Sequence, residues 1–290
     1  MSNQPIQFPQ ENSPLRLVSS HLPFDAPEAI SLNKARMEML DSLLKTLSTY
    51  VELKSALDVG AGVGYFSRFL KDRGFEVVGV EGREENVQEA QRRHPDIQFL
   101  CRNVEDPSLP EIGAFDLVLA LGLLYHLENP FAAVRNLARM TKQVLLIESM
   151  VIGWDYPSML LVEEYKVINQ GLSYVSFYPS ESCLVAMLYY AGMPFIYKPK
   201  KMPNHKDFKR YWLHDKARTI LVATPFEVSH PALVPIRFNG MPSPLNLDDT
   251  KFRLFNRFYR AFSKFYGFLS RLPIKMRYRM QWLRSQLGIN

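Results

Sequence analysis

The sequence predicts a doubly wound α/β fold, in which a mostly parallel β-sheet carries helices on both faces. Apolar runs of five to seven residues, rich in Val, Leu and Ile, alternate with polar or amphipathic segments of helical length. Continuous apolar runs are typical of parallel strands that are buried on both faces. The first run ends in a glycine-rich turn followed by a predicted helix, which is the nucleotide-holding corner of such sheets.

The predicted elements follow one another in a regular alternation. Five strands are expected at residues 54–59, 76–81, 97–101, 115–121 and 143–147, and two closing strands at 195–197 and 219–223. Helices are expected at 67–73, at 84–93, from Pro130 onward and at 181–190. A further helix before the first strand is expected to begin at a cap formed by Ser31 or Asn33. The aromatic-rich stretch 149–180 interrupts the alternation.

Composition divides the chain into four predicted parts. They are an irregular segment at 1–30, the α/β domain at 31–228, a proline-rich linker at 229–250 and a basic helical tail at 251–290. The tail holds ten of the 35 Lys and Arg residues and no acid, which leaves 25 basic and 29 acidic residues before it. Phenylalanines at helical spacing oppose these charges in the tail. We expect the tail to bind an anionic membrane, to bind RNA or to dock on the domain, with the membrane favoured over RNA.

The remaining composition argues for a cytoplasmic protein, peripheral at the inner membrane surface if the tail binds lipid. No apolar run reaches the roughly 18–20 residues of a membrane span, and the first residues lack the features of a signal peptide. Cys101 and Cys183 lie in apolar runs, as buried reduced thiols do. The histidines lack metal-ligand spacing, so no metal site is expected.

The glycine turn indicates which nucleotide is bound. Residues 57–66 read Leu-Asp-Val-Gly-Ala-Gly-Val-Gly-Tyr-Phe. The dinucleotide fingerprint requires glycine at the position of Tyr65. The Gly-x-Gly-x-Gly spacing, with Asp58 two residues before Gly60, instead resembles motif I of the class I S-adenosylmethionine (SAM) methyltransferases. This resemblance implies a Rossmann-like SAM methyltransferase sheet and SAM as the cofactor.

Two later segments fit a bound nucleoside. Glu81 ends the second strand, where an acid accepts hydrogen bonds from ribose hydroxyls; the alternative is a solvated acid at a strand end. The segment Asn103-Val104-Glu105-Asp106 follows the third strand. In SAM enzymes this loop flanks the adenine, with Val104 against the ring and a polar neighbour at the exocyclic amine.

The stretch 115–130 carries the most specific resemblance. Its pattern Phe-Asp-x-Val, then Gly-x-Leu-Tyr-His, then Pro, resembles the SAM methyltransferases grouped with the bacterial tRNA wobble-uridine carboxymethyltransferases. The resemblance covers about residues 54–200, and it implies that Leu121 lies against the cofactor and Tyr125 faces its reactive end. The residues expected to bind SAM are Asp58, Gly60, Gly62, Gly64, Tyr65, Glu81, Gly82, Asn103, Val104, Glu105, Leu121 and Tyr125.

The chain departs from this family in ways that favour plain methyl transfer over carboxymethyl transfer. Leu127 and Glu128 stand where the family has two basic residues, and the family's long N-terminal region has no counterpart of similar length. Tyr125 and His126 are the expected catalytic residues: Tyr125 at the sulfonium, and His126 as a base for a hydroxyl acceptor or as a structural histidine. Glu148 is a second candidate base.

Three functions remain open at this stage. The favoured function is a SAM-dependent methyltransferase acting on a small or saccharide-type acceptor, lipid-linked if the tail binds membrane. The second is modification of a tRNA wobble uridine, which rests on family resemblance. The third is a nucleotide-binding or NAD-binding module without methyl chemistry; Tyr65 and the Tyr125-His126 pair argue against it.

Overall fold

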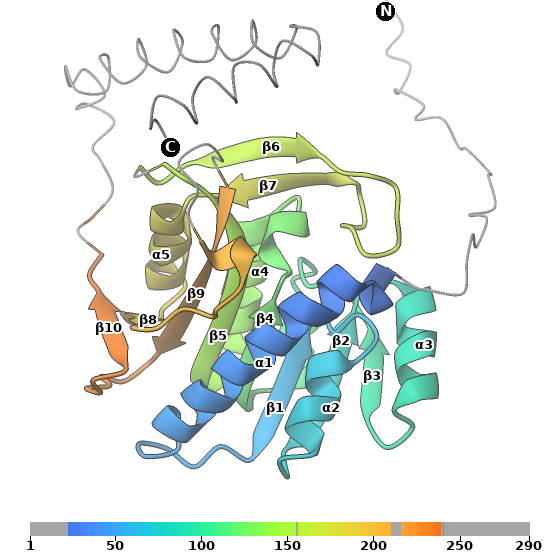
Figure 1. Cartoon of the computed structure of the whole chain (residues 1–290), viewed down its shortest axis with the longest axis horizontal. Coiled ribbons are helices and arrows are strands. Elements are labelled where there is room, and N and C mark those ends of the chain that lie inside the picture. Colours follow the sequence, from blue (N-terminus) through green and yellow to red (C-terminus); the bar gives the residue numbers. More distant parts are fainter. Residues whose placement is uncertain (1–22, 155, 210–215, 239, 241–290) are drawn as a thin grey trace, which may run out of the picture. The chain divides into compact units, whose positions relative to one another are not determined.

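The computed structural model describes residues 23–154, 156–209, 216–238 and 240, and the structural statements below concern these residues. Its central element is an eight-stranded sheet with the order β10-β8-β9-β5-β4-β1-β2-β3 (Figure 1). Strands β1 to β5 run parallel, whereas β9 pairs antiparallel with β5, β8 with β9 and β10 with β8. The strands of this sheet are β1 (Ser55–Val59), β2 (Glu76–Glu81), β3 (Gln98–Cys101), β4 (Phe115–Leu121), β5 (Thr141–Ile152), β8 (Phe195–Pro199), β9 (Lys216–Thr224) and β10 (Leu233–Ile236).

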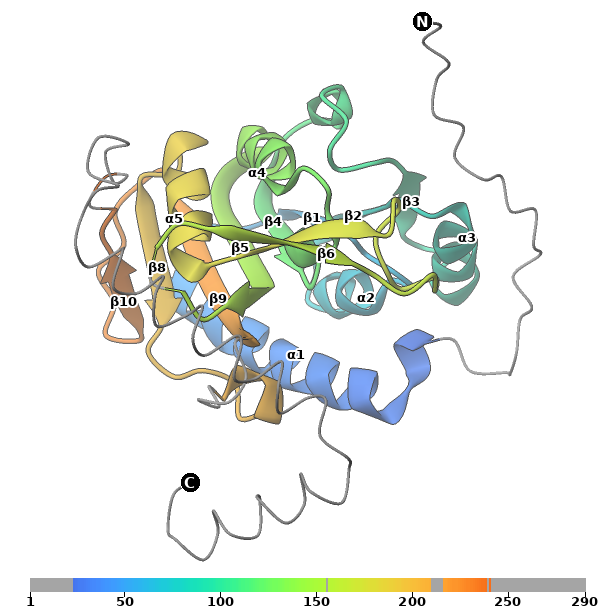
Figure 2. The same ribbon diagram turned by 90° about the horizontal axis from the view of Figure 1, so that it is seen from above.

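Five helices cover the two faces of this sheet (Figure 2). They are α1 (Pro27–Leu47), α2 (Tyr65–Lys71), α3 (Glu84–Arg93), α4 (Pro130–Arg139) and α5 (Glu181–Tyr190). Helices α1, α2 and α3 share one apolar core cluster with the sheet, while α4 and α5 share the other. Short 3-10 turns lie at Pro23–Asp25, Leu109–Ile112, Leu124–His126 and Lys206–Phe208. The doubly wound α/β prediction is therefore confirmed.

The bounds of several elements match the sequence prediction because local chemistry defines them. Strand β4 is a continuous apolar run that is buried from Leu117 to Leu121, as a central strand requires. Helix α3 ends at Arg93 because His94 precedes Pro95, and the residue before a proline avoids the helical conformation. Helix α5 begins after Ser180, whose hydroxyl accepts a hydrogen bond from the N–H of Cys183.

Helix α1 begins earlier than predicted. It starts at Pro27, with Ala26 at the N-cap and no side-chain cap, so the predicted caps at Ser31 and Asn33 are wrong. Proline is favoured in the first helical turn because it has no N–H, and an N–H at that position would lack a helical partner in any case. Residues 27–30 of the segment predicted to be irregular are therefore helical, and residues 1–22 lie outside the described residues.

Two features of the second half were not predicted. The aromatic-rich stretch contains a two-stranded hairpin of β6 (Met159–Glu163) and β7 (Val175–Pro179), which lies above the carboxyl ends of the parallel strands (Figure 1). Part of the predicted linker forms strand β10 at the edge of the sheet. Strand β5 also runs longer than expected, to Ile152.

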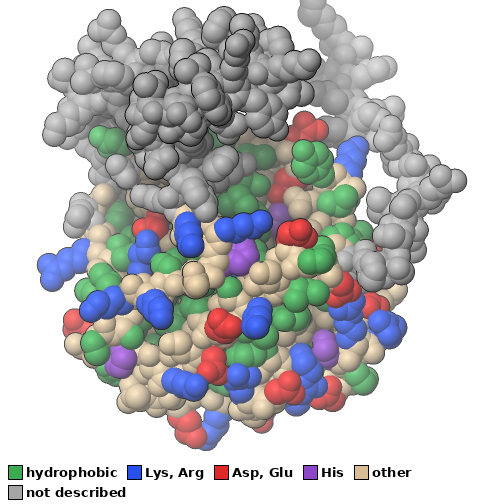
Figure 3. All heavy atoms as spheres, in the orientation of Figure 1, with side chains coloured by type: hydrophobic (Ala, Val, Ile, Leu, Met, Phe, Trp, Pro, Cys, Tyr) green, Lys and Arg blue, Asp and Glu red, His purple; other side chains and the backbone are tan. Residues whose placement is uncertain are grey.

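The chain divides into two units, residues 1–239 and 240–290. The predicted basic tail at 251–290 lies outside the described residues. Within the residues that the structure describes, no helix is long and apolar enough to cross a membrane. On the face shown in Figure 3, acidic and basic side chains are interspersed over the lower half.

Candidate functional site

The glycine turn, residues 60–64, joins β1 to α2 at the carboxyl edge of the sheet. The N–H groups of Gly60 and Ala61 donate to the Val80 carbonyl of β2, at 2.8 and 3.0 Å. Gly62 has a φ of +55°, a left-handed conformation that glycine adopts without steric cost. The backbone itself therefore requires glycine in this turn, and the turn is held against the end of β2.

Glu81 faces the glycine turn from the end of β2. Its Oε2 accepts a hydrogen bond from the Gly62 N–H at 3.0 Å. Its Oε1 accepts from the Arg83 N–H at 3.1 Å and from Asn86 Nδ2 at 3.3 Å. The acid identified from the sequence is thus oriented by three donors at the edge where a nucleoside is expected.

Two residues expected to touch the cofactor lie beneath the turn instead. Asp58 is buried, and its carboxylate accepts a hydrogen bond from Ser67 Oγ of α2 at 2.6 Å. A Cβ on Gly64 would lie 2.7 Å from the side chains of His94 and Phe99. Neither residue lines the two pockets described below, because both face the packing between the sheet and its helices. In this structure both residues support the turn from below, and their contact with the cofactor stays a prediction.

Burial affects the charge of Asp58. It raises the pKa of this carboxyl to about 6, although the hydrogen bond from Ser67 acts in the opposite direction. At neutral pH the ionised carboxylate therefore lowers the free energy of unfolding, although its hydrogen bond with Ser67 supports the turn.

A first pocket, here called the turn pocket, lies between the glycine turn, the end of β2 and the loop after β3. Gly82, Asn103 and Val104 line it, together with Glu81. Glu105 does not, because its carboxylate accepts a hydrogen bond from the N–H of Asn129. Its neighbours in the same loop, Asn103 and Val104, line the pocket, and contact of Glu105 with the cofactor stays a prediction.

Residues 165–174, between the hairpin strands (Figure 1), are here called the cover loop, and residues 168–172 of this loop line the turn pocket. Arg83 Nη2 donates to the Gly171 carbonyl at 2.6 Å. Asn86 Nδ2 donates to the Ile168 carbonyl at 3.1 Å. Two residues that follow Glu81 therefore hold the cover loop over the pocket.

A second pocket of about 330 Å³, here called the arginine pocket, lies on the other side of the turn. Leu121, Tyr125 and Tyr65, which the sequence analysis assigned to the cofactor site, line it. Arg36 from α1 and Arg218 from β9 also line it. Arg218 Nη2 donates to the Tyr125 hydroxyl at 3.2 Å, so a cation and a phenol meet at this pocket.

The two pockets adjoin each other at the glycine turn, and together they are here called the cleft. Gly60, Gly62 and His126 are among the residues that line both of them. The ring of Phe24 also lines both, and it lies 2.8 Å from the place where a Cβ on Gly62 would be. The cleft therefore runs from Glu81, past the glycine turn, to Tyr125.

Glu148 is held in a buried ionic cluster with the two arginines. Its Oε2 lies 2.6 Å from Arg36 Nη2, and its Oε1 lies 2.9 Å from Arg218 Nη1. Burial opposes the charge of this carboxyl, but the two guanidinium groups outweigh it and hold its pKa below the ordinary value. Both oxygens are engaged and the charge is stabilised, so the suggestion that Glu148 acts as a general base is corrected.

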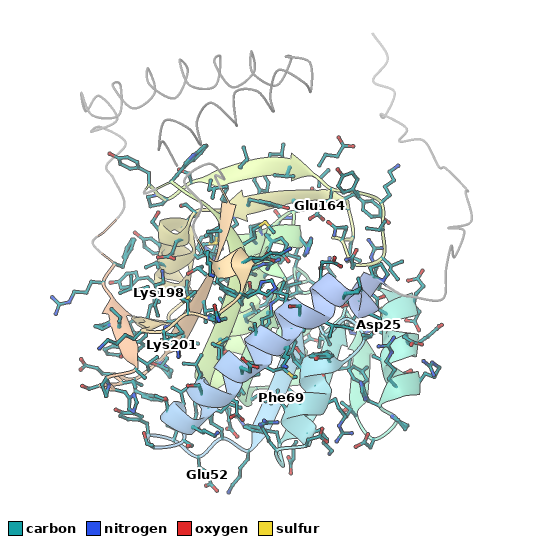
Figure 4. All side chains as sticks on the ribbon, in the orientation of Figure 1. Asp25, Glu52, Phe69, Glu164, Lys198 and Lys201 are labelled. Atoms are coloured by element: carbon teal, nitrogen blue, oxygen red, sulfur yellow. The ribbon has the colours of Figure 1, made fainter. Side chains whose placement is uncertain are left out.

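His126 is paired with a carboxylate that was not predicted. Its Nδ1 lies 2.6 Å from Oε1 of Glu164, whose side chain is 1% exposed. Figure 4 labels Glu164, which lies at the end of β6 beneath the hairpin. The ring of Tyr125 lies against the same imidazole, with ring centroids 4.1 Å apart. For a structural histidine we expected a hydrogen bond to the backbone. Nδ1 of His126 instead bonds the Glu164 side chain.

Three charged residues of this cleft were missed by sequence reasoning. Arg36, Glu164 and Arg218 lie on α1, at the end of β6 and on β9, far apart along the chain. None sits in a local motif. The sequence could have indicated Arg36 and Arg218 in one way only. Each is a charged residue among the apolar residues of a predicted helix or strand.

Comparisons with known proteins agree with this geometry. Residues 57–144 match a family model described as a methyltransferase domain. The tRNA U34 carboxymethyltransferase of Psychromonas ingrahamii is 30% identical over 133 residues, which are 43% of this chain and 40% of that protein. The enzyme of the same description from Shewanella denitrificans is 33% identical over 147 residues, 47% of this chain and 42% of that protein. The matched segment spans less than half the length of these relatives.

A solved structure resembles the fold. The crystal structure of the N-terminal domain of EvdMO1 with SAH bound has a TM-score of 0.54 and 22% identity, and it covers 65% of this chain and 80% of that chain. Residues 57–144 therefore resemble a methyltransferase domain, and the chain shares the fold of that solved structure. The chain resembles the branch that includes the bacterial tRNA U34 carboxymethyltransferases.

Proposed function

We propose that this protein binds SAM along the cleft and transfers its methyl group to an acceptor in the arginine pocket. The single observation that carries the proposal is that the two pockets adjoin each other at the glycine turn. Glu81 and Val104 stand at the end suited to adenosine, whereas Tyr125 and His126 stand at the other. The sulfonium carbon of SAM is electrophilic, so the protein has chiefly to align an acceptor lone pair with it and to exclude water.

Each residue has a proposed role in this reaction. Glu81 accepts hydrogen bonds from the ribose hydroxyls, and Val104 packs against the adenine. Tyr125 contacts the sulfonium end through its ring or hydroxyl. The cover loop excludes water from the adenosine end of the cleft.

Calorimetry with SAM, its demethylated product and NAD tests this proposal. We expect binding of SAM and of the product in the micromolar range and no binding of NAD. Glu81→Gln should weaken SAM binding, because a neutral amide accepts ribose hydroxyls less strongly. Glu76→Gln, at the exposed start of the same strand, is the matched control. Binding of NAD without binding of SAM would refute the proposal.

For the acceptor, we propose a small or saccharide-type molecule. The arginine pocket has the volume of a small-molecule site. The charges on the visible face are interspersed rather than gathered in the basic patch that RNA-binding surfaces present (Figure 3). If residues 251–290 bind anionic lipid, the acceptor is met at a membrane surface. Extract from cells that lack the protein, incubated with protein and methyl-labelled SAM, should show label in the small-molecule or lipid fraction rather than in RNA.

One observation favours a second candidate, carboxymethyl transfer to a tRNA wobble uridine. Arg36 and Arg218 line the arginine pocket; both pair with Glu148, and Arg218 Nε also lies 3.6 Å from Asp207. Guanidinium groups at this pocket suit a carboxylate on the transferred group, and matched relatives are tRNA U34 carboxymethyltransferases. Tighter binding of carboxylated SAM than of SAM, together with a carboxymethyl mass increase on tRNA, would establish this candidate over the first.

A further inference from the structure

Glu164 connects two parts of the cleft that the proposed function uses separately. Its Oε1 lies 2.6 Å from Nδ1 of His126, and its Oε2 accepts a hydrogen bond from the Gly171 N–H at 2.8 Å. Gly171 belongs to the cover loop and lines the turn pocket. One buried carboxylate therefore contacts both the imidazole and the loop that closes over the adenosine end.

The surroundings keep Glu164 ionised. Burial disfavours its charge, but the bond to His126 and the Gly171 N–H outweigh burial and hold the pKa of Glu164 below its ordinary value. Tyr125, from the same 3-10 turn, packs against the imidazole, and Tyr178 of β7 packs against Tyr125. Arg218 of β9 lies behind them, on the Tyr125 hydroxyl.

An ionised carboxylate on Nδ1 determines what the other ring nitrogen can do. The neutral imidazole places its proton on Nδ1, in the bond to Glu164, and leaves the lone pair on Nε2. The His126 side chain is 15% exposed and lines both pockets, so it reaches the space where an acceptor meets the methyl group.

We propose that Glu164 is a positioning residue that makes His126 the general base for a hydroxyl acceptor, and that it couples this base to closure of the cover loop. The inference rests on the proposed methyl transfer. As the acceptor oxygen bonds the methyl carbon, the sulfur–methyl bond breaks and its electron pair stays on sulfur, which gives the neutral thioether. The acceptor proton passes to Nε2, and the resulting imidazolium pairs with Glu164.

Nuclear magnetic resonance of the histidine rings tests the positioning role without any acceptor. In the full-length protein, labelled with nitrogen-15 in histidine, His126 should be the Nδ1–H tautomer, with its signals assigned by their loss in His126→Gln. In Glu164→Gln the Nδ1–H tautomer should be less populated, because a neutral amide accepts the Nδ1 proton less strongly than a carboxylate. Glu163→Gln, at an exposed position at the end of β6, should leave the tautomer population unchanged. An Nε2–H tautomer in the parent, or an unchanged Nδ1–H population in Glu164→Gln, would overturn the proposal.

Methyl transfer into cell extract tests the catalytic consequence. With labelled SAM, Glu164→Gln should lower the plateau rate by about 100-fold, at the low end of what general-base catalysis contributes. An unchanged rate would contradict a base at His126.

Calorimetry with the demethylated product separates this inference from the proposed function. Product binding by Glu164→Gln that stays within about threefold of the parent shows that the fold and the cleft are intact. If the parent itself does not bind the product, the proposed function fails, whereas the tautomer measurement still decides the role of Glu164.

Discussion

At the scale of single residues, the site divides into groups that face the cleft and groups that support it. Glu81 and His126 face the cleft and were identified from their positions after strands. Asp58, also part of the motif, supports the turn from below through Ser67. A sequence motif names residues that occur together, but the direction of each side chain depends on the pleat of β1 and on the helix packed beneath it.

The buried carboxyl of Asp58 makes a prediction about stability. Its pKa is raised to about 6 in the folded protein, so its contribution to folding is most favourable below its unfolded pKa and is lost as pH rises toward 6. Asp58→Asn keeps an acceptor for Ser67 and removes the charge. At pH 7.5 we expect the free energy of unfolding of this variant to be about 1–3 kcal/mol higher than that of the parent. Urea denaturation measures this difference, which should shrink toward pH 4.

Asp96→Asn serves as the control, because Asp96 lies on the surface with its side chain 52% exposed. Its variant should change the free energy of unfolding little and without this pH dependence. A destabilised Asp58→Asn at pH 7.5 would mean that the charge itself is needed for folding.

At the scale of elements, the cleft is assembled by contacts between segments that are distant in sequence. The ionic cluster of Glu148 joins α1, β5 and β9, and the cover loop is held by Arg83, Asn86 and Glu164. Neither the ionic cluster nor the anchoring of the cover loop has a sequence signature, because each depends on which elements the sheet places side by side. Each of the two leads to its own prediction.

Glu148→Gln should destabilise the protein strongly. Arg36 and Arg218 would face each other with their side chains about 8% exposed and without the carboxylate between them. Leaving buried charges unpaired costs about 3–5 kcal/mol, to be measured by urea denaturation at pH 7. Because the pKa of Glu148 is lowered, its stabilisation is present at neutral pH and is lost as pH falls, so the deficit should shrink in acid.

The control for this experiment is Glu52→Gln. Glu52 pairs with Lys54 at the surface, with side chains 76% and 70% exposed. Its loss should cost less than about 1 kcal/mol. If Glu148→Gln costs no more than Glu52→Gln, the cluster does not stabilise the junction of α1, β5 and β9.

Gly171→Ala should disturb the cover loop rather than the fold. A Cβ at this position would lie 2.0 Å from the carbonyl oxygen of His126, which is backbone and cannot rotate away. The loop would have to lift, so we expect binding of the demethylated product to weaken by about tenfold or more in calorimetry. Ser173→Ala, an exposed position of the same loop, should bind normally. Equal binding by the two variants would show that closure of the loop does not contribute to affinity.

At the scale of the whole molecule, the parallel part of the sheet was predictable and its extensions were not. Strands β2 and β4 and helix α3 have the predicted bounds, because buried apolar runs and Pro95 define them locally. Strand β10 was missed because it contains Pro235, which lacks an N–H and is tolerated only at a sheet edge. The outer face of β6 keeps Met159 and Leu161 exposed, so this strand lacks the apolar–polar alternation that would have identified it.

Residues 251–290 lie outside the described structure, and their prediction rests on the sequence alone. Ten Lys and Arg residues without one acid, in 40 residues, separate charge by sign in a way that solubility does not require. Phenylalanines at helical spacing add a second attraction, which phosphate contacts to RNA would leave unused. We expect these residues to bring the protein to an anionic membrane surface.

Co-sedimentation with vesicles tests this last prediction. Binding should require anionic lipid and weaken with salt, because each basic residue near the surface contributes about 1 kcal/mol. Truncation after Asp249 should abolish it. Phe258→Glu combined with Phe262→Glu should also disrupt it, since buried rings add to the electrostatic attraction, whereas charge-driven affinity for RNA should change less because every Lys and Arg is retained. If the full-length protein does not bind anionic vesicles at low salt, the membrane prediction is wrong. Residues 251–290 would then dock on the protein or bind RNA.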